Sequence, residues 1–155
     1  MVFIKTKSGF WFFVAVLFIA VFSLIVLSSQ SVQAQETVSN ESTVEYWAVI
    51  VGVSDYSSAA LDLGDIDDAI ALYDELAPVC GEDHVNLLTD NEATKANISD
   101  AICGWLDEHE DSNDVVLFYF SGHGNRGVLA PYDSSRYISG KAISRVELED
   151  WLDEL

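Results

Sequence analysis

The sequence feature most suited to catalysis is a histidine between two glycines, Gly122-His123-Gly124. It directly follows residues 115–120, a run of apolar and aromatic residues typical of a buried strand. Ligands of open α/β sheets bind outside the carboxyl ends of the strands, so this histidine stands where chemistry is expected. The glycines allow unusual backbone angles and the close approach of a peptide. We interpret His123 as a candidate general base, and the alternative is a structural histidine in a loop.

A nucleophile for that base is harder to find. The chain has two cysteines, Cys80 and Cys103, and neither directly follows a predicted strand. Cys80 comes just after one predicted helix and Cys103 lies within another, so we interpret both as packing residues. Two cysteines allow one disulfide at most and cannot form a zinc ribbon. A serine hydrolase is also excluded, because Ser121 lacks the Gly-x-Ser-x-Gly turn.

The elements that must position His123 follow from hydrophobic periodicity. Residues 46–53 form a continuous apolar run rich in β-branched residues, which predicts a strand covered on both faces. Apolar residues at spacings of three and four predict helices. The predicted order is a strand at 46–53, a helix over 66–77 that stops near Pro78, a strand at 84–88, a helix from Thr94 to Leu106, a strand at 115–120 and a helix opened by the capping box Ser144-Arg-Val-Glu147. Alternating strands and helices predict an α/β fold with a mostly parallel sheet.

Charge limits the possible partners. Lys and Arg number 7 against 26 Asp and Glu, which gives a formal net charge of −19. Such a surface excludes an electrostatic case for binding nucleic acid or an anionic membrane surface, so we predict no nucleic-acid partner. Half of the residues are hydrophobic, which is too many for a disordered acidic chain.

The N-terminal segment predicts export. Residues 10–27 are apolar apart from Ser23, and Lys5 and Lys7 precede them with no acidic residue before Glu36. We interpret residues 1–34 as a signal peptide or an N-terminal membrane anchor, 35–44 as a linker and 45–155 as the folded domain. The domain is then exported, and is either secreted or anchored to the outer face of the cytoplasmic membrane. Membrane contact is expected only through residues 10–27, if they are retained.

Several segments, taken in order and spacing, resemble the caspase-like cysteine peptidases, and the metacaspases in particular. They are YWAVIVGVSDY at 46–56, GDIDDAIAL at 64–72, LLTDNEAT at 87–94 and LFYFSGHG at 117–124. The resemblance implies a three-layer caspase-like fold with strand order 2-1-3 and the first two helices on opposite faces of the sheet. Cys80 and Cys103 are then two free thiols. It also implies proteolysis by a cysteine–histidine dyad.

The same resemblance implies the site. His123 is the catalytic histidine, and the Gly124 amide is an oxyanion donor. Asp68 and Ser121 match residues of the substrate pocket in metacaspases, and Asp62 stands nearest the place where caspases that cut after Asp carry an arginine. Charge complementarity then implies a protein or peptide substrate with Arg or Lys at P1. The alternative role of Asp68 is to stabilise the helix dipole from the first turn.

No cofactor is expected. Many metacaspases use calcium, but Arg126 and Arg145 fall near the places of the acidic ligands, so we predict no metal site. Family cysteines follow the histidine by about 50 residues, whereas the sequence ends 32 residues after His123. We therefore expect a catalytic domain truncated after the third core strand and the following helix, inactive by itself. The alternative is a non-catalytic caspase-like domain that binds peptides or partners.

Overall fold

The computed structural model describes residues 2–5, 43–59, 61–64, 67–135 and 141–155. Its strands are β1 (Val2–Lys5), β2 (Tyr46–Gly52), β3 (Val85–Thr89), β4 (Val115–Ser121), β5 (Gly124–Asn125), β6 (Val128–Leu129) and β7 (Ile143–Ser144). Its helices are α1 (Asp67–Cys80), α2 (Lys95–Asp100), α3 (Asp107–His109) and α4 (Arg145–Asp153). In the described part of the chain no helix is long and apolar enough to cross a membrane.

The main sheet has the strand order β1-β4-β2-β3. Strands β2, β3 and β4 are parallel, and β2 lies between the other two. The expected 2-1-3 order of the core strands is therefore confirmed. Strand β1 pairs with the other edge of β4 and runs antiparallel to it. The edge strands of the sheet are thus β3 on one side and β1 on the other.

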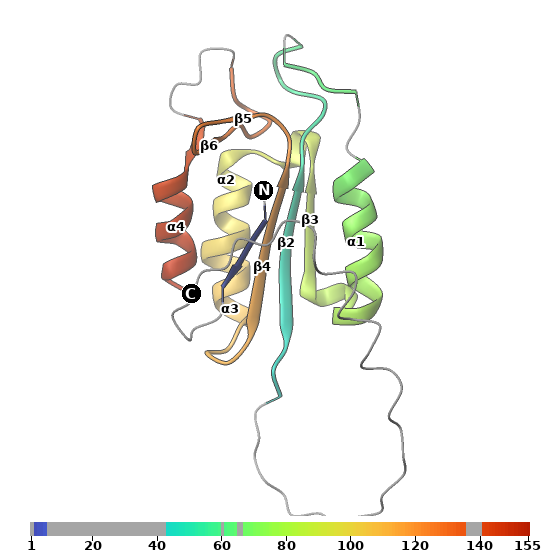
Figure 1. Cartoon of the computed structure of the whole chain (residues 1–155), viewed down its shortest axis with the longest axis vertical. Coiled ribbons are helices and arrows are strands. Elements are labelled where there is room, and N and C mark those ends of the chain that lie inside the picture. Colours follow the sequence, from blue (N-terminus) through green and yellow to red (C-terminus); the bar gives the residue numbers. More distant parts are fainter. Residues whose placement is uncertain (1, 6–42, 60, 65–66, 136–140) are drawn as a thin grey trace, which may run out of the picture.

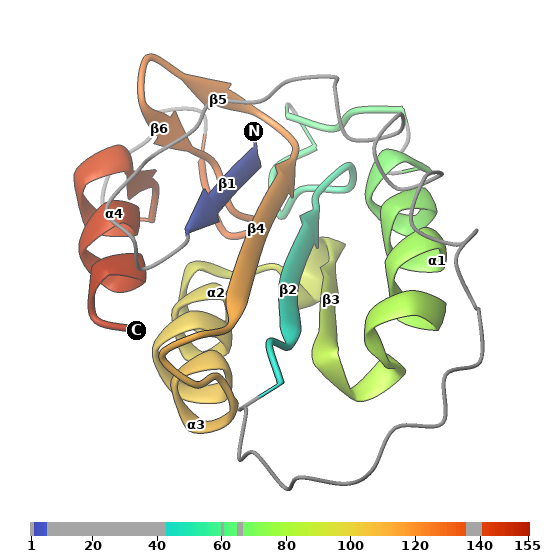
Figure 2. The same ribbon diagram turned by 60° about the horizontal axis from the view of Figure 1, so that its bottom comes forward.

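Helices cover both faces of this sheet (Figures 1 and 2). Helix α1 packs on one face, against a cluster that includes Ile50 and Val85. Helices α2, α3 and α4 cover the other face, where the larger core gathers around Phe118. The first two helices of the domain therefore lie on opposite faces, as expected for right-handed crossovers. This α/β architecture with helices on both faces is the fold class that the sequence predicted.

The two central strands bury their side chains differently. Strand β2 is buried at every position after Tyr46, as its continuous apolar run predicts. Strand β4 alternates instead between buried and half-buried positions. Val116, Phe118 and Phe120 join the larger core, while Leu117 and Tyr119 face α1.

Helix boundaries and exposure depart from prediction at several points. Helix α1 continues through Pro78 to Cys80, because the Gly81 N–H donates to the Ala77 carbonyl at 3.0 Å and closes the last turn. Ile70, an apolar residue of the helix predicted over 66–77, is 40% exposed, although apolar residues at helical spacing were expected to be buried. His84 precedes β3 in a short 3₁₀ turn and is not part of the strand. The residues between α2 and α3, Ala101–Leu106, form a π-helical turn in an otherwise continuous helix.

Two parts of the fold were not predicted at all. Strands β5, β6 and β7 form a small antiparallel sheet between His123 and α4. Each has two residues, too few to show an alternating pattern. Strand β1 belongs to the segment interpreted as a signal peptide or anchor. The apolar run at 10–27, on which that interpretation depends, lies outside the described residues.

Candidate active site

The carboxyl ends of the parallel strands lie at one edge of the sheet. Gly52, the last residue of β2, pairs with Thr89 of β3 on one side and with Ser121 of β4 on the other. The Val53 N–H continues the ladder by donating to the Ser121 carbonyl at 2.9 Å. The loops that follow the three strands therefore meet at this edge, where the small sheet also lies (Figure 1).

His123 is held at this edge by two hydrogen bonds from different atoms. Its backbone N–H donates to the Tyr56 hydroxyl oxygen at 2.7 Å, and its Nε2 lies 2.8 Å from the Leu61 carbonyl oxygen. A carbonyl oxygen can only accept, so Nε2 carries the hydrogen. In the neutral imidazole Nδ1 then has the lone pair. The ring is thus fixed in the tautomer in which Nδ1 can accept a proton.

Tyr56 is a residue that sequence reasoning missed. It is 4% exposed, and its ring centroid lies 5.3 Å from that of His123. Burial raises the pKa of Tyr56, the hydrogen bond from His123 opposes this, and the charge of Asp90 adds to the rise. The phenol therefore stays protonated at neutral pH. Its position after β2 in Ser-Asp-Tyr gave no sign of contact with a histidine 67 residues away.

The loop that carries Leu61 is closed by its own polar contacts. The Asp62 carboxylate accepts the Tyr56 N–H at 3.0 Å, and the Leu63 N–H donates to the Ser54 carbonyl at 2.7 Å. The Leu61 N–H donates to the Ser58 carbonyl at 2.8 Å. Asp62 thus shapes the loop that presents the Leu61 carbonyl to the histidine.

Asp90 joins this loop to the end of β3. Its Oδ1 accepts the N–H groups of Ser54 and Asp55, both at 2.9 Å, and lies 3.3 Å from the Ser54 hydroxyl. Asp90 has a φ of 40°, a left-handed conformation that Asp tolerates better than most residues. The Thr-Asp-Asn sequence after a strand was the available signal for such a turn.

Both glycines beside His123 are required by close contacts. Gly122 has a φ of +156°, and a methyl group there would lie 2.9 Å from the Tyr56 hydroxyl. A methyl group at Gly124 would lie 2.9 Å from the Val128 carbonyl oxygen. These distances are shorter than van der Waals contact, so larger residues would force the loop to move.

The hairpin of β5 and β6 sets the direction of the Gly124 amide. The Ala130 N–H donates to the His123 carbonyl at 3.0 Å, which makes His123 and Ala130 a hydrogen-bonded pair. Gly124 and Leu129 are the next pair along the hairpin. Hydrogen-bonded and non-hydrogen-bonded pairs alternate between antiparallel strands, so the Gly124 N–H points away from β6. The N–H of the residue that follows His123 is therefore directed outward from the hairpin.

Asp68 and Ser121, the predicted pocket residues, lie on the α1 side of the sheet. Asp68 is exposed in the first turn of α1, and Ser121 is half-buried at the end of β4. Tyr119 lies on the same side of the sheet. Burial raises the pKa of Tyr119, a hydrogen bond with the Ser121 side chain opposes this, and the charge of Asp68 raises it further. Ser121 therefore bonds a tyrosine hydroxyl that sequence reasoning missed, and Asp68 acts on the same hydroxyl only through its charge.

The two cysteines lie away from this edge. Both are free, which confirms that no disulfide joins them. Cys80 ends α1, next to the turn that leads into the start of β3, and so lies at the amino end of the strands. Cys103 is exposed in the π-helical turn, on the other face of the sheet, so its interpretation as a packing residue is wrong. Partial burial raises the pKa of both thiols, and the charges of neighbouring acids add to the rise at Cys103, so neither is activated as a thiolate.

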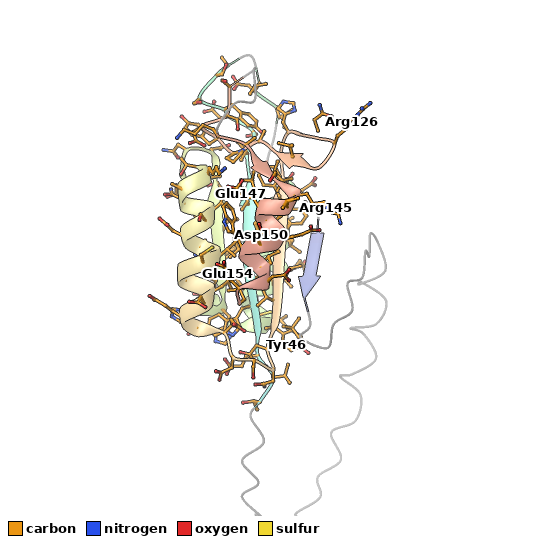
Figure 3. The ribbon with its side chains drawn as sticks, turned by 90° about the vertical axis from the view of Figure 1, so that its left-hand side faces the viewer. Tyr46, Arg126, Arg145, Glu147, Asp150 and Glu154 are labelled. Carbon is orange, nitrogen blue, oxygen red and sulfur yellow. The ribbon has the colours of Figure 1, made fainter. Side chains whose placement is uncertain are left out.

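The described residues contain no group of three or more His, Cys, Asp or Glu side chains that could hold a metal ion. Arg126 lies at the tip of the β5–β6 hairpin, while Arg145 and Glu147 lie along α4; Tyr46 lies at the opposite end of the molecule (Figure 3). The Arg145 Nε donates to the Glu149 carboxylate at 2.7 Å, one turn along α4.

A family model described as the caspase domain matches residues 45–154. No curated protein matches the chain.

Proposed function

Because this chain belongs to the caspase family of cysteine peptidases, we propose that its His123 is the general base for peptide-bond hydrolysis by a cysteine that residues 1–155 do not supply. The observation that carries the proposal is the hydrogen bond from His123 Nε2 to the Leu61 carbonyl, at 2.8 Å. It leaves Nδ1 as the basic nitrogen and orients the ring. A base with a fixed tautomer and a fixed orientation is what activation of a thiol requires.

In the proposed reaction, Nδ1 takes the proton of a cysteine thiol and the thiolate attacks the scissile carbonyl carbon. The outward N–H of Gly124 stabilises the negative oxygen of the tetrahedral intermediate. The imidazolium then gives its proton to the leaving amine. His123 next takes a proton from water, which attacks the acyl group and releases it from the cysteine. Tyr56 takes no part in proton transfer and only holds the His123 backbone.

We place the nucleophile on a segment outside residues 1–155. Cys80 lies at the opposite end of the sheet from His123, and Cys103 lies along a covering helix. The thiols of both have raised pKa values. A cysteine at the carboxyl end of a further parallel strand beside β4 would instead lie next to His123, because neighbouring strands are about 4.8 Å apart. Such a strand would have to replace β1, which occupies that edge of β4.

For the substrate we propose a peptide with Arg or Lys at P1. Asp68 supplies a carboxylate near Ser121 and Tyr119, and the chain has a net charge of −19. A cationic side chain is complementary to both. We further propose that the domain acts outside the cytoplasm, on the basis of the apolar run at residues 10–27 and the lysines before it.

The test is to express the reading frame as it stands in the genome, with whatever follows codon 155, and to assay fluorogenic peptides ending in Arg, Lys or Asp. We expect turnover of the basic peptides, abolished by His123→Ala and by substitution of a downstream cysteine. Residues 1–155 alone should show no turnover. A frame that supplies no further cysteine, with peptides bound but not cleaved, would instead identify a non-catalytic peptide-binding domain.

A further inference from the structure

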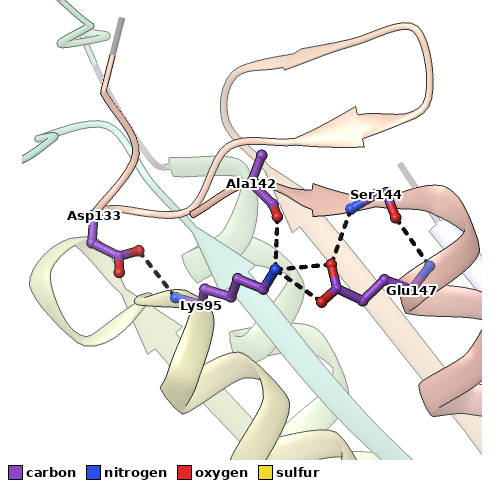
Figure 4. A network of polar contacts seen from close by, with 5 residues as sticks. All are labelled: Lys95, Asp133, Ala142, Ser144 and Glu147. Carbon is purple, nitrogen blue, oxygen red and sulfur yellow. Dashed lines mark hydrogen bonds and ion pairs between the residues drawn. The ribbon is translucent and has the colours of Figure 1, made fainter. Parts of the chain in front are cut away.

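Lys95, the first residue of α2, contacts three separate segments of the chain (Figure 4). Its backbone N–H donates to the Asp133 carboxylate at 3.1 Å. Its Nζ donates to the Ala142 carbonyl at 2.9 Å and pairs with both carboxylate oxygens of Glu147, at 2.8 and 2.9 Å. One residue therefore joins α2 to the loop after β6, to the residue before β7 and to the first turn of α4.

This cation is less exposed than the others that form ion pairs in the described residues. The Lys95 side chain is 23% exposed, compared with 61% for Lys141 and 54% for Arg145. Ion pairs that are partly withdrawn from water are screened less and are costly to break when one partner is removed. Glu147 also completes the capping box with Ser144, so its loss would free the start of α4.

Two contacts of Lys95 lie where β6 ends and β7 begins, which is the same end of this antiparallel pair. Strand β6 leads into the loop that contains Asp133, and Ala142 leads into β7. Strand β6 pairs with β7 on one side and with β5 on the other. Because β5 begins with Gly124, directly after His123, its position depends on the two strands that Lys95 holds.

A second path supports the same connection. The Tyr132 N–H donates to the Ala93 carbonyl at 2.9 Å, just before α2 begins. The Ala130 N–H donates to the His123 carbonyl. The segment between β6 and Asp133 is thus bonded to the start of α2 at one end and to His123 at the other.

We infer that Lys95 is a positioning residue for the site, which holds the small sheet so that the Gly124 amide and the His123 ring keep their directions. This inference rests on the function proposed above, which gives those two groups their roles. Lys95 acts through Ala142, Glu147 and Asp133 and does not touch the substrate.

The test uses NMR of the full chain and needs no peptidase activity. The chain has three histidines, so each imidazole gives a separate signal: His123 reports on the site, while His84 and His109 report on the opposite edge. We expect Lys95→Met and Glu147→Gln to shift the Gly124 amide and His123 ring signals and to speed hydrogen exchange at Val128 and Leu129 several-fold. The His84 and His109 signals should stay in place. Lys95→Arg, which keeps the charge, should restore the parent signals in large part.

Two controls separate positioning from general stabilisation. Glu149→Gln removes the comparable but exposed ion pair with Arg145 on α4, and it should not shift the Gly124 amide signal. Ile98→Val loosens the buried face of α2 and should lower the unfolding midpoint without shifting the site signals. The inference is overturned if Lys95→Met and Glu147→Gln leave Gly124 and His123 as in the parent, or if Ile98→Val shifts them equally. If the signals shift as expected but the genomic product cleaves no peptide, the proposed function fails and the structural coupling stands.

Discussion

His123 and Leu61 are joined by a hydrogen bond of 2.8 Å between the imidazole Nε2 and a main-chain carbonyl oxygen. A carbonyl in this place does the work that a carboxylate does in other catalytic triads, since it selects the tautomer and the direction of the ring. Unlike a carboxylate, it brings no full charge to stabilise the imidazolium. The orientation of the base therefore depends on the backbone of the loop after β2.

We predict that neutral His123 is protonated at Nε2. The carbonyl of Leu61 cannot donate, so only this tautomer makes the observed bond. Nitrogen-15 NMR of the imidazole above pH 8 measures the tautomer directly. A dominant Nδ1–H form would show that the loop does not hold Leu61 against the ring and would remove the basis of the proposed mechanism.

Tyr56→Phe should destabilise the domain by about 1–2 kcal/mol, because the His123 N–H loses its acceptor without gaining another. Urea denaturation of the variant and the parent gives the difference. Tyr46→Phe is the matched control, since the Tyr46 side chain is 53% exposed and its change should be within about 0.5 kcal/mol. Equal effects of the two substitutions would contradict the role given to Tyr56.

Two glycine substitutions should change stability in opposite directions. Gly124→Ala places a methyl group 2.9 Å from the Val128 carbonyl and should cost about 1–3 kcal/mol. Gly104→Ala has nothing within 4 Å of the new methyl group and lies inside a helix, where alanine is favoured by about 0.5–1 kcal/mol. Thermal unfolding of both variants tests the pair. A neutral Gly124→Ala would mean that the hairpin relaxes freely.

The domain should lose stability in acid because the stabilising contribution of Asp114 is lost when its carboxylate is protonated. Burial acts to raise its pKa, but the N–H groups of Glu45 and Asp111, the Trp47 indole and the charge of His84 together lower it below the ordinary value of 3.8. A group whose pKa is lowered in the folded state adds stability above its unfolded pKa, and this is lost as the pH falls through the folded pKa. Stability should therefore fall below about pH 4, and by less in Asp114→Asn.

Urea unfolding followed by circular dichroism at pH 6 and pH 3 gives the change in the free energy of unfolding between the two pH values for each protein. Glu108→Gln is the control, because this exposed acid belongs to α3 near the same edge and makes none of the Asp114 contacts. Should Asp114→Asn keep the full acid sensitivity of the parent, the contacts of Asp114 contribute nothing to it.

Asp68→Ala should lower kcat/KM for Arg and Lys peptides by about tenfold in the active genomic product, while 1 M salt should have a smaller effect. The reason is that a pocket contact is screened less than long-range attraction by the net charge. Asp74→Ala, which removes an exposed acid farther along α1, should change neither kcat/KM for the basic peptides nor the effect of salt on it. Unchanged cleavage of Arg peptides by folded Asp68→Ala would leave the residue only its role in the first turn of α1.

The sequence predicted best where the signal is local, either a run of similar residues or a short capping motif. The continuous apolar run of β2, the capping box of α4 and the Thr94 cap of α2, which accepts the Asn97 N–H, all appear as expected. Parallel strands then place His123 at a strand end, because the carboxyl ends must share one edge. The glycines on either side of His123 predicted close contacts, but not the residues that make them.

What could not be predicted depends on contacts between distant segments. Tyr56 and Leu61 meet His123 because Asp62 and Asp90 fold the loop after β2 back on itself. The sequence around Asp90 signals a turn but does not identify the N–H groups that it accepts. Lys95 is similar, since its partners at Ala142 and Glu147 lie 47 and 52 residues away. Side-chain pairs of this kind leave no periodic signal.

Strand β1 has a consequence for membrane topology. Its pairing with β4, Phe3 opposite Phe118, requires both segments to be in the same compartment. If residues 10–27 cross a bilayer, residues 2–5 and the domain lie on opposite sides and the pair cannot form. Cysteines placed at Ile4 and Leu117, the next pair in the register, in a chain with Cys80→Ser and Cys103→Ser, would therefore be joined by an added oxidant only in molecules that have not been translocated. The register of one short strand thus offers a way to count how many copies of the chain have left the compartment where they were made.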